Sequence, residues 1–203
     1  MDVFEALKTR RAVKKFDPSH KMSTDEIKTL LEHVILSPTS YNQQNWRFIF
    51  TTEQEIKNKI SIAAKDQPQP KDGSLVIVLC ADLDAWNKDP TRYWMHHPPE
   101  RRELVKKSLE VKYSNNPQNI RDEAIRSCSI AAQSIMLAAK HMNLDSCPMI
   151  GFDYEKLAEI IKLPENHIIA LMVVIGKRIG EPMSRGGQLP LDEVAFEIGR
   201  AHV

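Results

Sequence analysis

The sequence is poor in glycine and has none of the glycine-rich loops that bind nucleotide pyrophosphates. Only seven of its 203 residues are glycines, and none of them forms a GxGxxG or Walker-type motif. Such motifs let backbone amides approach a pyrophosphate at the start of a helix. We therefore do not expect a dinucleotide held by a Rossmann fingerprint.

The sequence also has no large excess of positive or negative charge and no long apolar run. The formal net charge is +1 at pH 7, which gives no electrostatic reason to expect nucleic acid as a partner. The longest apolar stretch, residues 127–139, is shorter than the roughly 20 residues that span a bilayer. The chain opens on a charged helix instead of a signal peptide. We expect a soluble, cytoplasmic protein with no membrane partner.

Paired cysteines are also missing. Cys80, Cys128 and Cys147 lie in apolar surroundings and show no CxxC spacing. Residues of this kind are usually buried free thiols in a reducing compartment.

What the sequence does have is a basic run near its N-terminus, RRAVKK at residues 10–15. Four cations in six residues repel one another unless an anion or water lies among them. A solvated basic turn is the ordinary interpretation. However, the run joins a short amphipathic helix to the apolar Phe16, so it should lie close to a core. Two Arg and one Lys at short spacing also suit a forked phosphate contact plus a point charge.

Hydrophobic periodicity and capping signals predict the secondary structure. Ser23 and Glu26 have the spacing of a capping box. The alanine-rich segment 121–142 suits either a dimer core or the central helix of a monomer. In the tail, Val194, Phe196 and Ile198 alternate as in a strand at a sheet edge. Helices are predicted over 2–9, from 23 to before Pro38, and over 54–65, 100–113, 121–142 and 154–162; strands are predicted over 46–52, 75–81 and 168–176.

Five segments carry a resemblance to a known family. Residues 8–17 (KTRRAVKKFD) resemble the N-terminal signature of the nitroreductase family, the FMN-dependent NAD(P)H oxidoreductases. The resemblance covers nearly the whole chain, and MIGFD and GGQLP look most like a bacterial and cyanobacterial branch that reduces quinones and nitro compounds. The other four signatures follow in the family's order at 37–49 (SPTSYNQQNWRFI), 66–74 (DQPQPKDGS), 147–153 (CPMIGFD) and 185–194 (RGGQLPLDEV).

The resemblance implies a fold and an assembly. The expected fold is a single α+β domain over residues 1–203, with a central mixed sheet flanked by helices. In this family the C-terminal tail crosses to a second subunit and adds a strand there. The chain is therefore expected to form an intertwined homodimer.

The first signature implies contacts with FMN. By resemblance, Arg10 and Arg11 contact the phosphate and the ribityl chain, while Ala12 replaces the usual Ser and keeps only a backbone contact. Lys14 approaches the N1–C2 carbonyl edge of the flavin, where a cation favours the reduced, anionic form. Lys15 is expected to be a solvated neighbour.

The second and third signatures imply contacts from two subunits. Thr39, Ser40 and Asn42 match the part of the second signature that reaches a flavin in the other subunit, although a polar turn after a proline is the plainer interpretation. Gln67 and Gln69 match amides that meet the pyrimidine ring and the ribityl hydroxyls.

The fourth signature has Ile150-Gly151 where well-known members have Glu-Gly. Gly151 can still offer its backbone N–H to the flavin N5, and a glycine permits close approach of the backbone. In the last signature, Arg185 is the candidate for a second phosphate cation, with Gly187 beside it; a flexible hinge with a surface arginine is the alternative.

Residues 86–99 (WNKDPTRYWMHHPP) could form a lid over the substrate. Trp86, Tyr93 and Trp94 offer flat apolar faces for aromatic acceptors and nicotinamide, or they simply anchor a long loop. His96 and His97 are adjacent and have no third ligand nearby, so no metal is expected.

These observations predict an FMN-dependent homodimer that transfers hydride from NAD(P)H to nitroaromatic or quinone acceptors by a ping-pong mechanism. Donor and acceptor would take turns over one flavin face, so neither a dinucleotide domain nor an acid–base triad is required. The alternatives are a flavin reductase or other flavin chemistry on the same fold, and a flavin-binding regulatory module without turnover. The choice between NADH and NADPH stays open, because Arg92, Arg101 and Arg102 are all available for a 2′-phosphate.

Overall fold

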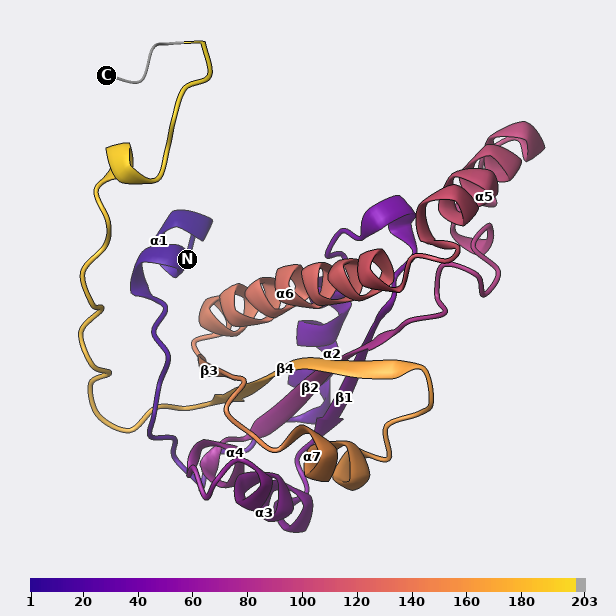
Figure 1. The fold of residues 1–203 in the computed structure, drawn as a ribbon. Helices are drawn as coiled ribbons and strands as arrows, with labels where there is room; N and C mark the ends of the chain where they lie inside the picture. The colour runs from indigo at the N-terminus through magenta and orange to yellow at the C-terminus, as the bar shows by residue number, and fades with distance from the viewer. Residues whose placement is uncertain (200–203) are drawn as a thin grey trace.

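A four-stranded sheet lies between two layers of helices in the computed structural model (Figure 1). The structure describes residues 1–199, and the last four residues of the expected domain 1–203 lie outside the described part. The strand order is β1-β2-β4-β3. The strands are β1 Trp46–Thr51, β2 Leu75–Asp82, β3 Asp145–Met149 and β4 His167–Gly176.

The expected α+β class is confirmed, whereas the sheet formed by residues 1–199 is antiparallel and not mixed. All three pairs of neighbouring strands run antiparallel. Parallel pairing among these residues occurs at an isolated bridge between Ala12 and Ser146. The mixed sheet was expected from the family resemblance alone, and no local pattern in the sequence determines the direction in which distant strands pair.

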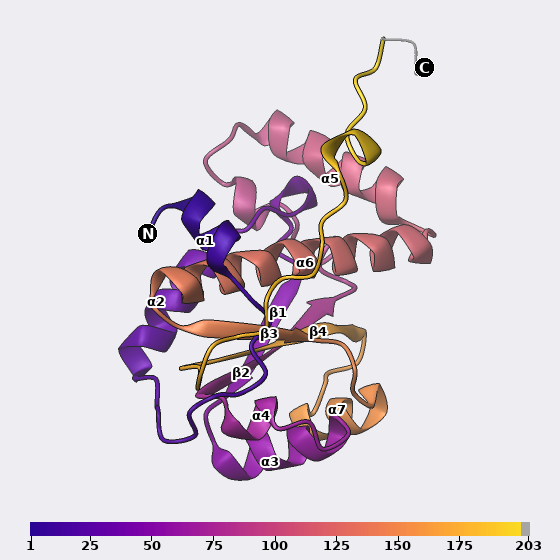
Figure 2. The same ribbon diagram turned by 90° about the vertical axis from the view of Figure 1, so that its left-hand side faces the viewer.

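Alternation along the strands divides the core into two clusters. Leu75, Ile77 and Leu79 of β2 pack on one face, and Val76 and Val78 pack on the other. Figure 2 shows the two helical layers on either side of the sheet. The helices are α2 Thr24–Val34 and α6 Pro117–His141 on the first face, and α3 Gln54–Ala63, α4 Gln69–Asp72 and α7 Tyr154–Ile161 on the second.

The predicted helices are confirmed with small shifts at their ends. The capping box of α2 is formed, with hydrogen bonds in both directions between Ser23 and Glu26. Helix α6 begins at Pro117, earlier than predicted, because the Asn116 side chain accepts a hydrogen bond from the Asn119 N–H and proline is favourable in the first turn.

Strand β3 was not predicted, because its residues are poor strand formers. Asp145 and Pro148 both fall within it. Its place at the sheet edge accommodates Pro148, since an edge strand can lack one N–H donor. Asp145 accepts a hydrogen bond from Lys140 Nζ at 2.9 Å, which pairs its buried charge. The one-turn helix α4 was also missed.

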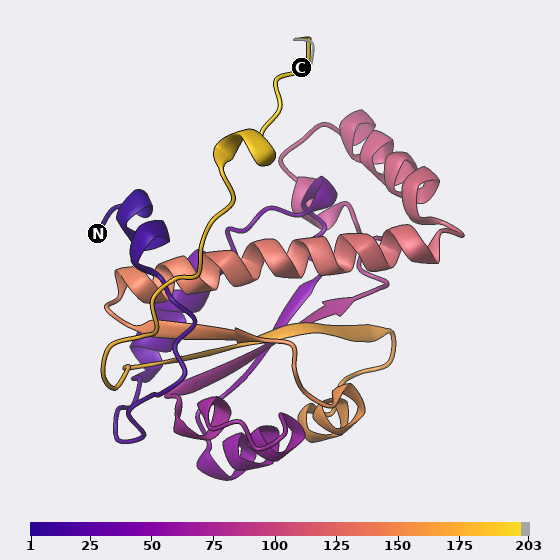
Figure 3. The same cartoon turned by 60° about the vertical axis from the view of Figure 1, so that its left-hand side comes forward.

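Different parts of the chain lie at the two ends of α6, which Figure 3 shows from the side. Helix α1, Val3–Thr9, lies at the C-terminal end of α6, and helix α5, Pro99–Tyr113, projects from the other end. None of the helices within residues 1–199 combines the length and apolar character needed to cross a bilayer.

Within the described residues the tail adds no strand to its own sheet, and its expected pairing with a second subunit stays a prediction. After β4 the tail runs past α1 and away from the sheet, with one short helical turn, η3, at Leu191–Glu193 (Figure 1). Val194, Phe196 and Ile198 are all exposed. A strand needs a neighbouring strand to satisfy its backbone groups, and the tail lies beside neither edge of its own sheet.

Candidate functional site

The basic run is held against the edge strand β3, as its position before an apolar residue predicted. The Val13 N–H donates to the Ser146 carbonyl at 3.0 Å. Val13 and Phe16 are buried, whereas Lys14 and Lys15 between them and Ala12 before them are exposed. The buried residues fix the backbone, so the side chains between them project from a defined edge of the sheet.

Three guanidinium groups converge beside α1. Arg11 Nη1 donates to the carbonyls of Lys8 and Arg10 at 2.8 and 2.9 Å. Arg185 Nη2 donates to the carbonyls of Leu7 and Arg10 at 3.0 and 3.1 Å. Burial lowers the pKa of Arg10, and the like charges of Arg185 and Arg11 lower it further. Such a concentration of positive charge favours an anion at this place.

Lys14 is placed beside the middle of β3. Its Nζ lies 3.7 Å from Cys147 Sγ. Burial raises the pKa of the Cys147 thiol, and the nearby ammonium only partly offsets this, so the sulfur remains a neutral thiol. A cleft of about 440 Å³ lies between residues 12–15 and 179–183.

The third and fourth signatures meet at a hydrogen bond. Gln67 Nε2 donates to the Gly151 carbonyl at 3.1 Å. A Cβ placed on Gly151 would meet only that amide nitrogen, at 3.6 Å, so the space beside this backbone is otherwise open. Ile150 is exposed next to it. Gln69 is 4% exposed, and its Oε1 has no hydrogen-bond partner among residues 1–199.

Four of the five signatures therefore lie around β3, and the second lies elsewhere. Ala12 of the first signature pairs with Ser146 of β3, and Ile150 and Gly151 follow that strand. Gln67 contacts Gly151, and Arg185 contacts Arg10. Gly187 is exposed, and a Cβ there would meet no atom within 4 Å.

Thr39, Ser40 and Asn42 lie at the opposite end of α6. The Ser40 N–H donates to Glu123 Oε1 at 3.1 Å, whereas His141 at the other end of α6 contacts the Met1 carbonyl. The helix from Glu123 to His141 is about 27 Å long at a rise of about 1.5 Å per residue. These residues cannot reach the arginine cluster of their own chain.

The second signature folds into a strained turn. Tyr41, Asn42 and Gln44 all have positive φ, at 52°, 51° and 47°, a region that is costly for residues other than glycine. The Gln44 N–H donates to Thr39 Oγ1 at 2.9 Å. Strain of this kind persists only where surrounding contacts enforce it, and it is frequent at functional sites.

Helix α5 and Trp94, which precedes it, make hydrogen bonds that hold the strained turn in place. The sequence did not predict these contacts. Ser40 Oγ accepts hydrogen bonds from Lys112 Nζ at 3.0 Å and from the Tyr113 hydroxyl at 2.9 Å. Trp94 Nε1 donates to the Tyr41 carbonyl at 3.1 Å. No local pattern marked Lys112 or Tyr113, because about 70 residues separate them from their partners.

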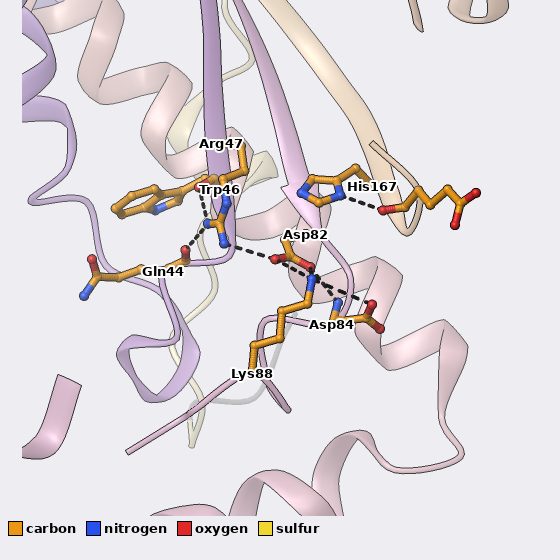
Figure 4. A network of polar contacts seen from close by, with 8 residues as sticks. Gln44, Trp46, Arg47, Asp82, Asp84, Lys88 and His167 are labelled. Atoms are coloured by element: carbon orange, nitrogen blue, oxygen red, sulfur yellow. Dashed lines mark hydrogen bonds and ion pairs between the residues drawn. The ribbon is translucent and has the colours of Figure 1, made fainter. Parts of the chain in front are cut away.

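A buried carboxylate joins this turn to residues 83–98 (Figure 4). Asp82, with its side chain only 4% exposed, accepts hydrogen bonds from Arg47 Nη2 at 3.0 Å and from Lys88 Nζ at 2.9 Å. Arg47 also donates to the Gln44 carbonyl at 2.8 Å. Burial alone would raise the pKa of Asp82, but hydrogen bonds from Lys88 and the Asp84 N–H outweigh it and hold the pKa below its ordinary value.

The aromatic residues of 86–99 differ in their surroundings. Trp86 and Trp94 pack against Val105, Leu109 and Tyr113, so both anchor the segment on α5. Tyr93 lies beneath the Arg92 guanidinium, 4.9 Å from its ring centroid.

Known proteins resemble this chain in both sequence and fold. A sequence model of the Nitroreductase family matches residues 7–177. Protein DrgA of Synechocystis sp. is 44% identical over 199 residues, covering 96% of this chain and 95% of its own. The oxygen-insensitive NADPH nitroreductase of Helicobacter pylori strain J99 is 28% identical over 200 residues, covering 95% of both chains.

Two solved structures share the fold. The putative nitroreductase ydfN of Bacillus subtilis superposes with a TM-score of 0.89 at 26% identity, over 96% of this chain and 98% of that one. A putative nitroreductase of Exiguobacterium sibiricum, solved in complex with FMN, superposes with a TM-score of 0.85 at 26% identity, over 97% of both chains. The helical layers and the sheet described above are therefore shared with both of these proteins.

Proposed function

The chain belongs to the nitroreductase family, and from that premise we propose that it is an FMN-dependent oxidoreductase that transfers hydride from NAD(P)H to nitroaromatic or quinone acceptors. One observation carries the proposal: the arginine cluster, Lys14, Gln67 and the open backbone at Gly151 all border β3. Relatives described as NADPH nitroreductases and a neighbour solved with FMN support it.

The residues around β3 fit FMN. Three converging guanidiniums suit one terminal phosphate, since Arg forks match phosphate oxygens. The buried Oε1 of Gln69 has no partner, and such an atom is costly unless a donor meets it; a ribityl hydroxyl is a donor of the right kind. The open space beside Gly151 admits a flat ring.

Each residue has a proposed task. The FMN phosphate is held by Arg10, Arg11 and Arg185. It is bordered by the Ala12 backbone and by Gly187. The ribityl chain and the pyrimidine edge are held by Gln67 and Gln69. When bound, FMN supplies the two-electron chemistry. Lys14 keeps a positive charge at the ring edge, Ile150 covers the ring, and the Gly151 N–H donates a hydrogen bond to it.

The functional unit in this proposal is a homodimer. About 27 Å of helix α6 separates the arginine cluster from Thr39, Ser40 and Asn42 of the same chain. These three residues would therefore complete the site of a second subunit. The tail exposes Leu189, Leu191, Val194, Phe196 and Ile198, and exchange of the tail would cover them while adding a strand to the partner's sheet.

Three further parts of the proposal concern the kinetics, the domain organisation and the cellular location. NAD(P)H and the acceptor use one site in turn, giving ping-pong kinetics, because the sequence holds no separate dinucleotide-binding loop. The chain acts as one domain over residues 1–203. Three buried free cysteines support a reducing, cytoplasmic compartment.

The absorption spectrum of the purified protein tests the proposal. We expect a yellow protein that releases FMN on denaturation, identified by chromatography, and parallel double-reciprocal lines when NADPH and a quinone are varied. A colourless protein that cannot be reconstituted with FMN overturns the assignment. Turnover with oxygen or free flavin alone would favour a flavin reductase, and bound flavin without turnover would favour a regulatory module.

A further inference from the structure

Two arginines at the start of α5 have no acidic partner among residues 1–199. Arg101 and Arg102 both lie in the first turn of the helix, where their N–H groups donate to the Pro98 carbonyl. The nearby Glu103 is paired with Lys107, at 3.9 Å. The two guanidiniums therefore keep their full charge available.

Arg102 is held in place without an oxygen acceptor. Its Nη1 contacts Met95 Sδ at 3.4 Å, and its Nε is buried with no hydrogen-bond partner. Thioether sulfur is a weak acceptor, and an unpartnered buried donor carries a free-energy cost. An anion bound to this guanidinium would supply the strong acceptor that the Met95 thioether does not.

Arg101 is oriented by an aromatic ring. Its guanidinium lies over Trp94, 5.9 Å from the ring centroid, within the range of a cation–π contact. Trp94 in turn donates to the Tyr41 carbonyl. Through Trp94, Arg101 is linked to the strained turn that, under the proposed function, faces the partner's flavin.

Helix α5 sets the distance between the pair and that turn. Lys112, which holds Ser40, lies about 15 Å along the helix from Arg102 at a rise of about 1.5 Å per residue. A ligand that engages both places must be extended, with an anionic group at one end and its reacting group at the other. A nicotinamide coenzyme with a 2′-phosphate meets this description.

We propose that Arg101 and Arg102 form the subsite for the 2′-phosphate of NADPH, and that the enzyme therefore prefers NADPH to NADH. This inference rests on the proposed function. Arg92 lies in the short helical turn before α5 with its guanidinium over Tyr93, whereas Arg101 and Arg102 are consecutive residues of α5. Arg forks bind a phosphate monoester through paired hydrogen bonds, and NADH has no such group.

Direct binding tests the subsite apart from catalysis. We expect the FMN-loaded protein to bind adenosine 2′,5′-bisphosphate about tenfold or more tightly than 5′-AMP in calorimetry, because charge-assisted contacts are lost with the 2′-phosphate. The double variant Arg101→Ala/Arg102→Ala should bind the two probes equally. Equal binding of both probes to the wild-type protein overturns the proposal.

Kinetics give the second readout. The double variant should raise the KM for NADPH about tenfold while the KM for NADH and both kcat values change less than about twofold. Lys106→Ala/Lys107→Ala is the matched control, since it removes two exposed cations from the next turn of α5 and should leave both KM values unchanged. A rise in KM of equal size for NADH and NADPH, or in the control, overturns the proposal by showing a general charge effect.

If the double variant fails to fold, the single variant Arg101→Glu replaces it in the test. Arg101 is exposed, so we expect this variant to fold. It should raise the KM for NADPH and not that for NADH, and no change overturns the proposal. Absence of flavin from the wild-type protein contradicts the proposed function itself, whereas a flavoprotein that uses both coenzymes equally contradicts only the subsite.

Discussion

The Arg185 guanidinium donates a hydrogen bond to the backbone carbonyl of Arg10, 3.1 Å away. This contact fixes the last signature of the chain against the first. The carbonyl orients Arg185 without neutralising it, so the charge remains free for a phosphate. Because like charges beside Arg10 already lower its pKa, bound phosphate should relieve repulsion as well as form hydrogen bonds.

Arg185→Ala and Arg10→Ala should each weaken FMN binding. Loss of one charge-assisted contact costs about 1.5–3 kcal/mol, which corresponds to a rise in Kd of roughly ten- to a hundredfold. The midpoint potential of the flavin that remains bound should be nearly unchanged. Fluorescence titration of the apoprotein with FMN measures the Kd, and Lys15→Ala is the control. A Kd equal to that of the wild type would remove the arginines from the site.

Lys14→Met should lower the midpoint potential while FMN stays bound. Two unit charges about 4 Å apart interact by roughly 4 kcal/mol at an effective dielectric of 20, but water and the remaining cations compensate. We expect about 1–2 kcal/mol in favour of the oxidised flavin, or a fall of about 20–40 mV for two electrons. Redox titration measures it. An unchanged potential would mean that Lys14 does not face the ring.

We expect Gly151→Ala to weaken FMN binding while leaving the free energy of unfolding of the apoprotein nearly unchanged. A Cβ there meets only Gln67 Nε2 at 3.6 Å, so the apoprotein should unfold within about 0.5 kcal/mol of the wild type, while FMN binding weakens because the methyl group enters the open space. Gly73→Ala is the opposite case. Its Cβ would meet Val174 Cγ1 in a severe overlap and should destabilise the fold by about 1–3 kcal/mol. Thermal unfolding with and without FMN distinguishes them; equal FMN affinity in Gly151→Ala and wild type would contradict the placement of the ring.

Truncation after Leu191 should lower both dimer stability and flavin content. It removes Val194, Phe196 and Ile198, which are exposed in one chain and would be buried on a partner. Analytical ultracentrifugation and the ratio of flavin to protein absorbance measure the two effects. A shortened chain that keeps its dimer and its full flavin content would rule out exchange of the tail.

Asp82→Asn should destabilise the protein in a pH-dependent way. The folded-state pKa of Asp82 is held below its ordinary value, so its stabilising effect is present above the unfolded pKa of about 3.9 and is lost as the pH falls through the folded pKa. Because Arg47 and Lys88 are largely exposed, we expect about 1–2 kcal/mol near pH 7. The difference between the two proteins in denaturant unfolding should begin to shrink below about pH 4 and should vanish once the pH is below the folded-state pKa. A difference that is constant with pH would show that the Asp82 charge is not responsible.

Local patterns determined much of this fold. The continuous apolar runs of β2 and β4, the capping box at Ser23 and the helical periodicity of α6 each depend on neighbours in sequence, and each was predicted close to its observed bounds. The basic run was also placed correctly against the core, because Phe16 follows it directly.

Only the tertiary structure decided where the distant parts meet. Asp145 and Pro148 form a strand because β4 offers an edge to pair with, a contact that local propensity opposes. Asp82, Arg47 and Lys88 converge because strand pairing brings the ends of β1 and β2 together. The length of α6 separates Ser40 from Arg10, and the contact with Trp94 orients the Arg101 guanidinium. These outcomes depend on non-local packing and on burial of charge, neither of which a single stretch of sequence contains.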